Sequence, residues 1–188
     1  VEPGTPFFLL QQKNRLPGLP SSSKSCSFYN KTKELCENNN LIHYEISNYA
    51  TQGHKSIHNL NYWRYGDFLG IGPGAYGRIS LNDQKYETES EKNPKKWLET
   101  VLGKEGRIYS KISALSSTDQ AREYALMSFR LKEGMNIDRY NSFSADRLQK
   151  NKVEELAQEG LLNISGNYIS TTDRGELLLN SILSQLLN

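Results

Sequence analysis

The stretch that decides the fold runs from Tyr44 to Gly77 and reads YEISNYATQGHKSIHNLNYWRYGDFLGIGPGAYG. Apolar and polar residues alternate over residues 42–47, and this period of two predicts a short strand. A second apolar run at 68–71 ends at the turn residues 72–74 and predicts another strand. Between the two strands, residues 58–63 carry more side-chain chemistry than a plain connector needs. Because loops at the ends of strands often carry function, we expect the site there.

The elements around this stretch predict a parallel α/β layer. Ser21–Ser23 are suited to cap a helix that continues to about Glu37, and the two predicted strands follow it. Helix, strand, loop and strand is the alternation of parallel α/β sheets and barrels. In those folds functional groups collect beyond the C-terminal ends of the strands. Residues 45–63 and 72–77 would occupy these positions.

The middle of the chain predicts a hairpin and a helix. Residues 78–91 are polar, with Asn82-Asp83 as the turn signal. Pro94 suits the first turn of a helix that ends near Leu102. Residues 113–118 then indicate a linker, and we place a domain boundary near 104–117.

The C-terminal part predicts a winged-helix-like unit. Helical patterns cover 117–132, with a capping box at Ser117 and Gln120, and about 145–159. Two strand patterns then flank Gly166-Asn167, a two-residue hairpin signal, and Thr172 can cap a last helix. Such units often bind DNA, but the second helix mixes Lys and Arg with as many Asp and Glu. Because a phosphate-binding face needs a net cationic stripe, we expect no nucleic-acid partner.

Four motifs follow one another in the chain: EPGTPF at 2–7, YEISNYA at 44–50, HNLNYW at 58–63 and GPGAYG at 72–77. In this order they resemble the HemW branch of the radical S-adenosylmethionine proteins, which are relatives of the oxygen-independent coproporphyrinogen III oxidases of porphyrin biosynthesis. The H-N-x-x-Y-W element is similar to that of the haem-chaperone branch. The resemblance covers most of the chain and is more specific than any single motif.

The resemblance implies a fold and a domain division. Residues 1–103 would be the C-terminal portion of an incomplete TIM-like (radical SAM) barrel with a connecting segment. Residues 104–188 would be a HemN C-terminal-like, winged-helix-like domain that packs against the barrel.

The resemblance also implies cofactors. In the family, a C-x-x-x-C-x-x-C motif that binds a 4Fe-4S cluster lies upstream of where Val1 stands. Cys26 and Cys36 are ten residues apart, whereas a cluster needs three or four closely spaced thiolates. We therefore expect the cluster and S-adenosylmethionine only in a full-length protein, and no catalytic residue in this chain.

The candidate haem-binding residues are His58, Asn59, Tyr62 and Trp63. A neutral imidazole nitrogen of His58 can ligate iron, and the aromatic rings of Tyr62 and Trp63 could line a slot for a flat porphyrin. Asn59 could orient the imidazole. The alternative is structural: His58 and Asn59 tie the loop to backbone carbonyls while the two aromatic residues belong to the core.

Three further residues are candidates for binding a cofactor. Glu45 is a carboxylate on an otherwise apolar strand, so it either forms a buried ion pair or faces the S-adenosylmethionine and substrate cavity, as the resemblance implies. Gly72 and Gly74 would let backbone amides approach a ligand, although tight turns need the same glycines. At Tyr76 the chain departs from the family, where a histidine often stands.

The amino-acid composition limits the partners and the cellular compartment that we expect. The net charge is +2, with 23 basic and 21 acidic residues, so no strong field points to a charged partner. No apolar run approaches the roughly 20 residues of a membrane span, and no signal peptide opens the chain. Two cysteines favour a reducing compartment. We expect a cytoplasmic protein whose membrane association, if any, arises through partners.

Two functions from different classes fit these observations. The first is haem binding and delivery to acceptor proteins, of which respiratory proteins are one class. The second is an oxygen-independent coproporphyrinogen III oxidase, which removes carboxyl groups from two propionates by a radical route. HNLNYW favours the first. A third alternative is a structural remnant, because a partial barrel exposes sheet edges.

Overall fold

We describe the protein from a computed structural model. It describes residues 3–103, 106, 108–143 and 147–187. The chain divides into two compact units, residues 1–41 and 42–188. Among the described residues, no helix combines the length and the apolar character that crossing a membrane requires.

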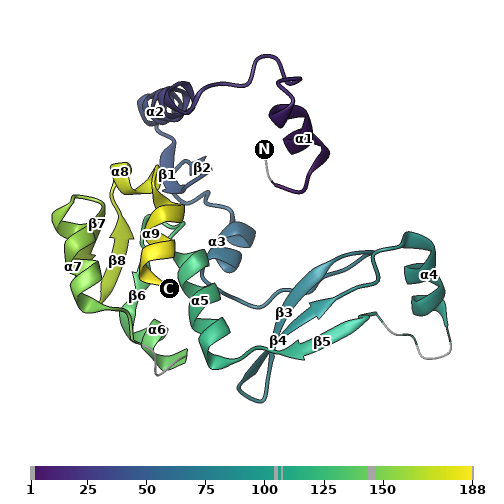
Figure 1. The fold of residues 1–188 in the computed structure, drawn as a ribbon. Helices are drawn as coiled ribbons and strands as arrows, with labels where there is room; N and C mark the ends of the chain where they lie inside the picture. The colour runs from purple at the N-terminus through teal and green to yellow at the C-terminus, as the bar shows by residue number, and fades with distance from the viewer. Residues whose placement is uncertain (1–2, 104–105, 107, 144–146, 188) are drawn as a thin grey trace. The chain divides into compact units, whose positions relative to one another are not determined.

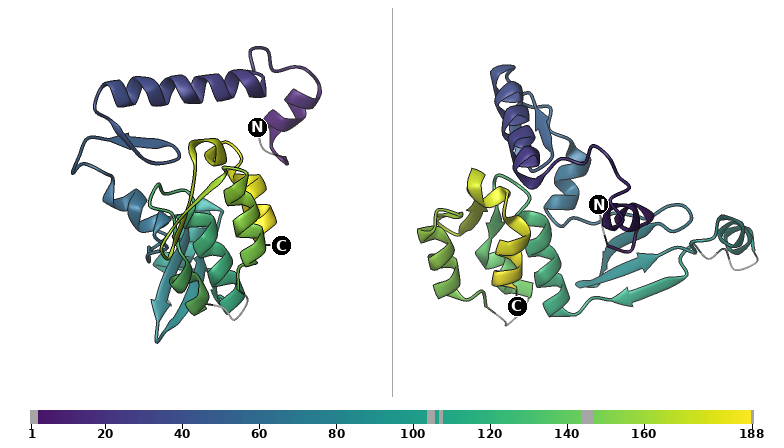
Figure 2. Two further views of the ribbon diagram at one scale, coloured as in Figure 1. Left: turned by 90° about the vertical axis from the view of Figure 1, so that its left-hand side faces the viewer. Right: turned by 45° about the horizontal axis from the view of Figure 1, so that its top comes forward.

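The first unit contains two helices. Helix α1 spans Pro6–Gln12, with Thr5 as its N-cap. Helix α2 spans Ser22–Asn38, and the Ser21 hydroxyl accepts a hydrogen bond from the amide of Lys24 at its start (Figure 2). The serine-capped helix predicted to reach Glu37 is thus confirmed, because a Ser N-cap satisfies an amide that has no partner within the helix.

The second unit opens with a hairpin rather than with parallel strands. Strand β1, Ile42–Glu45, pairs antiparallel with β2, Asn48–Ala50. The predicted strand 42–47 therefore ends at a turn. The other side of β1 contacts residues 130–132 of the C-terminal part, through hydrogen bonds from Lys132 N to Tyr44 O (3.1 Å) and from Ile46 N to Arg130 O (3.1 Å).

The segment after this hairpin also differs from the prediction. Residues 57–63 form helix α3, Ile57–Trp63, instead of a loop. The predicted strand 68–71 is reduced to a single bridge between Phe68 and Arg78. Every strand pairing among the described residues is antiparallel, so the parallel layer predicted for this stretch is not found there.

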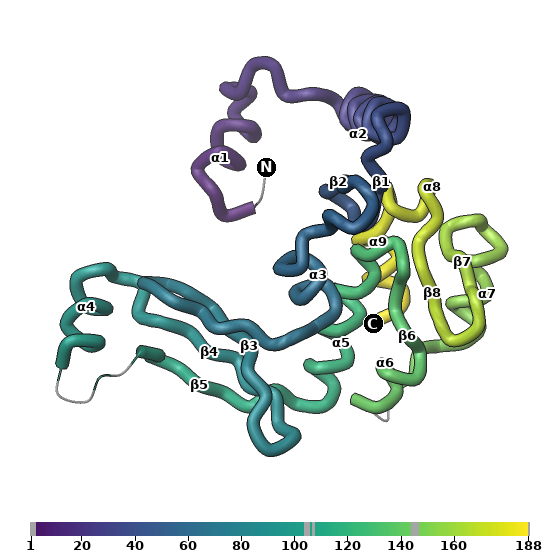
Figure 3. Tube along the Cα trace, turned by 180° about the vertical axis from the view of Figure 1, so that it is seen from behind, coloured from purple at the N-terminus to yellow at the C-terminus, as the bar shows by residue number. Residues whose placement is uncertain are grey.

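A three-stranded antiparallel sheet follows (Figure 1). Its strands are β3 (Tyr76–Leu81), β4 (Gln84–Glu89) and β5 (Lys111–Ala114), in the order β3-β4-β5. The turn residues Asn82 and Asp83 have φ of 49° and 61°, as a two-residue hairpin requires, so the predicted turn is confirmed. Figure 3 shows this turn projecting beyond β5.

Helix α4, Pro94–Leu102, lies at the other end of this sheet, with Pro94 in its first turn as predicted. Residues 111–114 belong to the sheet as β5, so the linker predicted over 113–118 is wrong at its start. Residues 104, 105 and 107, within the proposed boundary region, lie outside the described residues.

The C-terminal part is a small sheet flanked by helices. Strands β6 (Met135–Asn136), β8 (Tyr168–Thr171) and β7 (Leu162–Ser165) are antiparallel, in that order. The helices are α5 (Ser117–Ser128), α6 (Ile137–Phe143), α7 (Lys150–Gln158), α8 (Asp173–Glu176) and α9 (Leu179–Leu186). The hairpin at Gly166-Asn167 is as predicted. Thr172 caps a helix as predicted, but the expected last helix is divided into α8 and α9.

Two predicted helices are shorter than expected. Helix α5 is capped by Ser116, not Ser117, and it ends at Ser128 instead of Lys132 because residues 130–132 pair with β1. Residues 144–146, at the start of the predicted helix 145–159, lie outside the described residues.

The core lies in the C-terminal part, between the helices and the sheet. Its members are apolar or aromatic and less than a tenth exposed. They are Tyr65, Ala121, Tyr124, Ala125, Phe129, Met135, Tyr140, Val153, Leu156, Leu161, Leu162, Ile169, Leu179, Ile182, Leu183 and Leu186. Tyr65 joins this core from the segment that follows α3, so the helix is fixed to the C-terminal part.

Candidate functional site

Helix α3 places the HNLNYW residues. The Ser56 hydroxyl accepts a hydrogen bond from the amide of Asn59 (3.3 Å) and caps the helix start. The helix ends at Trp63 with Arg64 as its C-cap, and the φ of Tyr65, 59°, lies in the left-handed region. The Gly66 amide then donates to the Asn61 carbonyl (2.8 Å), which is typical of a helix C-terminus closed by a left-handed residue.

His58 and Tyr62 form one surface of this helix. They are four residues apart, and their ring centroids lie 4.6 Å apart in an edge-to-face arrangement. The Tyr62 ring also packs against Phe68, with the two ring centroids 4.2 Å apart. His58 is exposed, and within the described residues no hydrogen bond occupies its imidazole nitrogens. The imidazole is therefore accessible to a ligand, beside an aromatic surface.

Asn59 and Trp63 occupy the neighbouring face of the helix. Asn59 is exposed. Trp63 is half-buried, with the Arg130 guanidinium 4.6 Å from its ring centroid. The structure thus brings His58 and Tyr62 together and places the Trp63 indole against the C-terminal part. A cation held over an indole is attracted by the ring, so this contact fixes the end of α3.

Glu45 is almost fully buried, at 1% exposure. One carboxylate oxygen accepts the amide of Ser47 (3.2 Å), and the other accepts the side-chain amide of Asn48. These bonds close the turn between β1 and β2. The carboxylate is satisfied locally, without an ion pair among the described residues, and its role in cofactor binding stays a prediction.

The glycine turn supports the sheet. Gly72 and Gly74 have φ of 109° and 70°, which side chains rarely adopt. The Gly74 amide donates to the carbonyl of Glu91 (2.8 Å), so this amide is used within the chain. The Tyr76 hydroxyl donates to the Glu89 carboxylate (3.0 Å) across the first strand pair. Cofactor contacts from these glycines likewise stay predictions.

A partly buried polar network that sequence reasoning missed joins the end of α3 to the sheet. Glu123 on α5 accepts hydrogen bonds from the Tyr65 hydroxyl (3.0 Å) and, at both oxygens, from the Arg78 guanidinium (3.0 and 2.7 Å). Burial and the neighbouring Glu123 carboxylate raise the pKa of Tyr65. Lys85, 7% exposed, donates to the Tyr65 carbonyl (3.1 Å) and lies over its ring. These residues are far apart in the chain, and no pattern of spacing in the sequence predicts that they are in contact.

Arg64, directly after α3, forms a two-point ion pair with Glu133, with both contacts at 2.7 Å. The hydrogen bonds from Arg64 lower the pKa of the Glu133 carboxyl, although partial burial opposes the shift. A carboxylate whose folded pKa is depressed contributes stability above its unfolded value and loses that contribution as the pH falls through the folded pKa.

This gives a pH prediction. At pH 7 we expect Glu133→Gln to lower the free energy of unfolding by up to about 1 kcal/mol, since both partners are half exposed to solvent. As the pH falls below the ordinary value of 4.5, the wild type and the variant should converge. Urea unfolding at a series of pH values measures the gap. Glu99→Gln, an exposed control, should show no such convergence; a gap independent of pH at Glu133 would contradict the prediction.

The residues present do not fit an iron–sulfur cluster. Cys26 and Cys36 are both free and both on α2. In the part of the chain that the structure describes, no group of three or more His, Cys, Asp or Glu side chains could hold a metal ion. We therefore derive no step through such a cluster.

The chain is similar in sequence to a known protein family and to several known proteins. Residues 115–178 match the family model of the HemN C-terminal domain. The chain is 30% identical over 191 residues to heme chaperone HemW of Escherichia coli (strain K12), covering all of this chain and 47% of that protein. It is 31% identical to the mitochondrial radical S-adenosyl methionine domain-containing protein 1 of Dictyostelium discoideum, covering 99% of this chain and 47% of that protein.

Among solved structures, coproporphyrinogen III oxidase (HemN) from Escherichia coli, described as a radical SAM enzyme, is similar with a TM-score of 0.52 and 18% identity. The match covers 97% of this chain and 45% of that chain, and at this identity it shows the fold alone. The predicted fold class is confirmed as a mixed helix and strand fold that matches the C-terminal portion of HemN. The parallel strand layer expected within it is not found among the described residues.

Residues 115–178 thus match the HemN C-terminal domain, and the fold is similar to that of HemN. The resemblance to HemW proteins that the motifs predicted is confirmed, because relatives named heme chaperone HemW match along the whole chain. The chain spans about half the length of the curated relatives that it matches.

Proposed function

We propose that this chain is the haem-binding part of a HemW-like haem chaperone, with His58 as the iron ligand, and that the protein delivers haem to acceptor proteins. The observation that carries the proposal is the exposed imidazole of His58 at the edge of the Tyr62 ring, in a helix of the sequence HNLNYW. Relatives from several bacteria named heme chaperone HemW match the whole chain, which supports the same function.

Each motif residue takes a different role in this proposal. His58 supplies a neutral imidazole nitrogen to iron, since neutral imidazole is the commonest metal ligand in proteins and serves haem iron in several of them. Tyr62, with Phe68 behind it, offers an apolar aromatic surface to the macrocycle. Asn59 lies one residue further and can donate a hydrogen bond at the rim. Trp63 acts as a positioning residue through its contact with Arg130.

Haemin titration followed by the Soret band tests this proposal. We expect the wild-type chain to bind haemin, and His58→Ala to weaken binding at least tenfold, about 1.4 kcal/mol, because the axial ligand is lost. His54→Ala is the matched control, since His54 is also exposed but lies before α3. Equal Soret spectra for the wild type and His58→Ala would remove His58 from the site.

Other parts of the function belong to a full-length protein. We propose that it holds a 4Fe-4S cluster and S-adenosylmethionine outside this chain, acts in the cytoplasm and passes haem to respiratory acceptors. The names of the radical S-adenosyl methionine relatives support the cofactors. Reconstitution of the full-length protein with iron and sulfide, followed by absorption spectroscopy, tests for the cluster.

A coproporphyrinogen III oxidase activity is the competing function, and the likeness of fold to HemN supports it. Anaerobic assay of the full-length protein with coproporphyrinogen III distinguishes the two. We expect no decarboxylation; formation of the decarboxylated product would favour the oxidase.

A further inference from the structure

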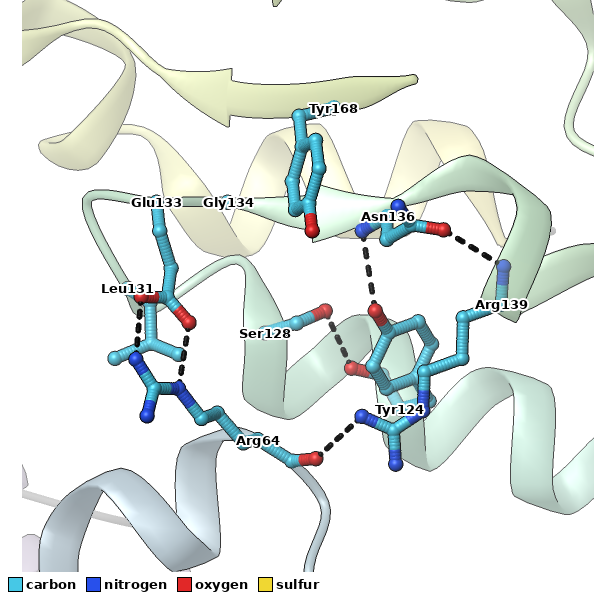
Figure 4. Close-up of a pocket in the computed structure, with 9 residues that line it drawn as sticks. All are labelled: Arg64, Tyr124, Ser128, Leu131, Glu133, Gly134, Asn136, Arg139 and Tyr168. Atoms are coloured by element: carbon cyan, nitrogen blue, oxygen red, sulfur yellow. Dashed lines mark hydrogen bonds and ion pairs between the residues drawn. The ribbon is translucent and has the colours of Figure 1, made fainter. Parts of the chain in front are cut away.

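A cavity of about 640 Å³ lies beside the C-terminal end of α3 (Figure 4). Arg64 lines one side, and residues from α5, β6, α6 and β8 line the others. Its volume falls within the roughly 300–1,000 Å³ of small-molecule sites. The motif residues of α3 do not line it.

Part of its polar lining is already used within the protein. The Ser128 hydroxyl donates to the Tyr124 carbonyl (2.6 Å), and the Tyr124 hydroxyl accepts the backbone amide of Asn136 (3.1 Å). By contrast, the Tyr168 hydroxyl and the Asn136 side-chain NH₂ have no hydrogen-bond partner among the residues that the structure describes. Figure 4 shows the Tyr168 hydroxyl directed into the space between Glu133 and Asn136.

The charge of the lining is unbalanced. Arg64 is matched by Glu133. The Arg139 guanidinium donates to the Arg64 carbonyl (2.8 Å) and lies 4.7 Å from the centre of the Tyr124 ring, but it forms no ion pair with a carboxylate in the described part of the chain. Arg139 therefore adds a positive charge without a counter-ion, among the described residues, to the cavity that the two available donors also line.

We propose that this cavity binds the carboxylate group of a small molecule, with Arg139 as the ion partner and Tyr168 and Asn136 as hydrogen-bond donors. A carboxylate only accepts hydrogen bonds, so a guanidinium, a hydroxyl and an amide NH₂ suit it. The carboxylate comes either from a free small acid or from a propionate of a porphyrin; the second source rests on the proposed haem function.

Calorimetric titration of the haem-free chain with succinate, at constant ionic strength, tests the first source. We expect saturable binding of succinate but not of the neutral succinamide. Tyr168→Phe should weaken binding about tenfold, as expected for a hydrogen bond to a charged group, and Arg139→Gln should abolish it. Tyr168 is 47% exposed, so its variant should fold normally. Arg174→Gln, at an exposed arginine that donates to the Glu159 carbonyl, should bind as the wild type does.

Haemin and its dimethyl ester test the second source. If the carboxylate is a propionate, esterification and Tyr168→Phe each weaken haemin binding about tenfold while the Soret position stays unchanged. Loss of His58 changes the Soret position, so failure of the iron ligand and failure of this cavity are distinguishable. The proposal is overturned if succinate does not bind and neither change affects haemin, or if Tyr168→Phe and Arg139→Gln bind both ligands as the wild type does.

Discussion

Phe129→Ala is expected to lower the free energy of unfolding by about 3–5 kcal/mol. Phe129 follows the last residue of α5, and its side chain is completely buried, at 0% exposure, in the core of the C-terminal part. Removal of the ring forfeits its transfer free energy and leaves a cavity that the surrounding helices fill only in part. Urea unfolding followed by far-ultraviolet circular dichroism measures the loss.

Leu126→Ala is the matched control, because Leu126 lies on the same helix but is 45% exposed. Its loss should cost well under half as much, since less apolar area leaves water on folding. Equal destabilisation by the two variants would show that the core is not centred on Phe129.

Gly134→Ala is the second large effect, and we expect it to cost about 3–4 kcal/mol. Gly134 has φ of 77°, where an L-residue is strained, and an added Cβ would lie 2.3 Å from the Ile169 carbonyl oxygen. That oxygen is backbone in β8 and cannot move aside without disturbing the pairing of β6 with β8. Thermal unfolding of the variant gives the measurement.

Gly160→Ala separates the two causes. Gly160 has a similar φ of 71°, but nothing lies within 4 Å of an added Cβ. We expect only the conformational cost, about 1–2 kcal/mol. If both glycine variants lose the same stability, close approach of the backbone at Gly134 is not the cause.

Local chemistry predicted most of the individual elements. Asn82-Asp83, Gly166-Asn167, Pro94 and Thr172 stand in the turns and caps expected of them, because those conformations are determined by neighbouring residues. The strand 42–47 was predicted from its alternation, and its first four residues form β1.

Pairing and helix ends could not be predicted in the same way. Helix α5 ends early because residues 130–132 hydrogen-bond to β1, more than 80 positions away in sequence. Residues 68–71 have an apolar pattern, yet one bridge to Arg78 is their whole pairing in the described structure. Tertiary contacts decide both cases, and no local pattern encodes them.

For the candidate site, the sequence predicted which residues take part but not which way their side chains point. His58 and Tyr62 share a face because they are four apart, whereas Trp63 is turned toward Arg130. The predicted loop at 58–63 is a helix because Ser56 caps it. The network around Glu123 joins residues from three separate elements, so only the fold brings them together.

The place of Trp63 gives the chain a built-in optical reporter. The chain has two tryptophans, and the other, Trp97, lies on α4. In a Trp97→Phe background, indole emission would come from α3 alone, a turn away from His58. An iron porphyrin absorbs in the range where indole emits, so arrival and departure of the macrocycle could be timed by quenching in a stopped-flow instrument, without any attached dye.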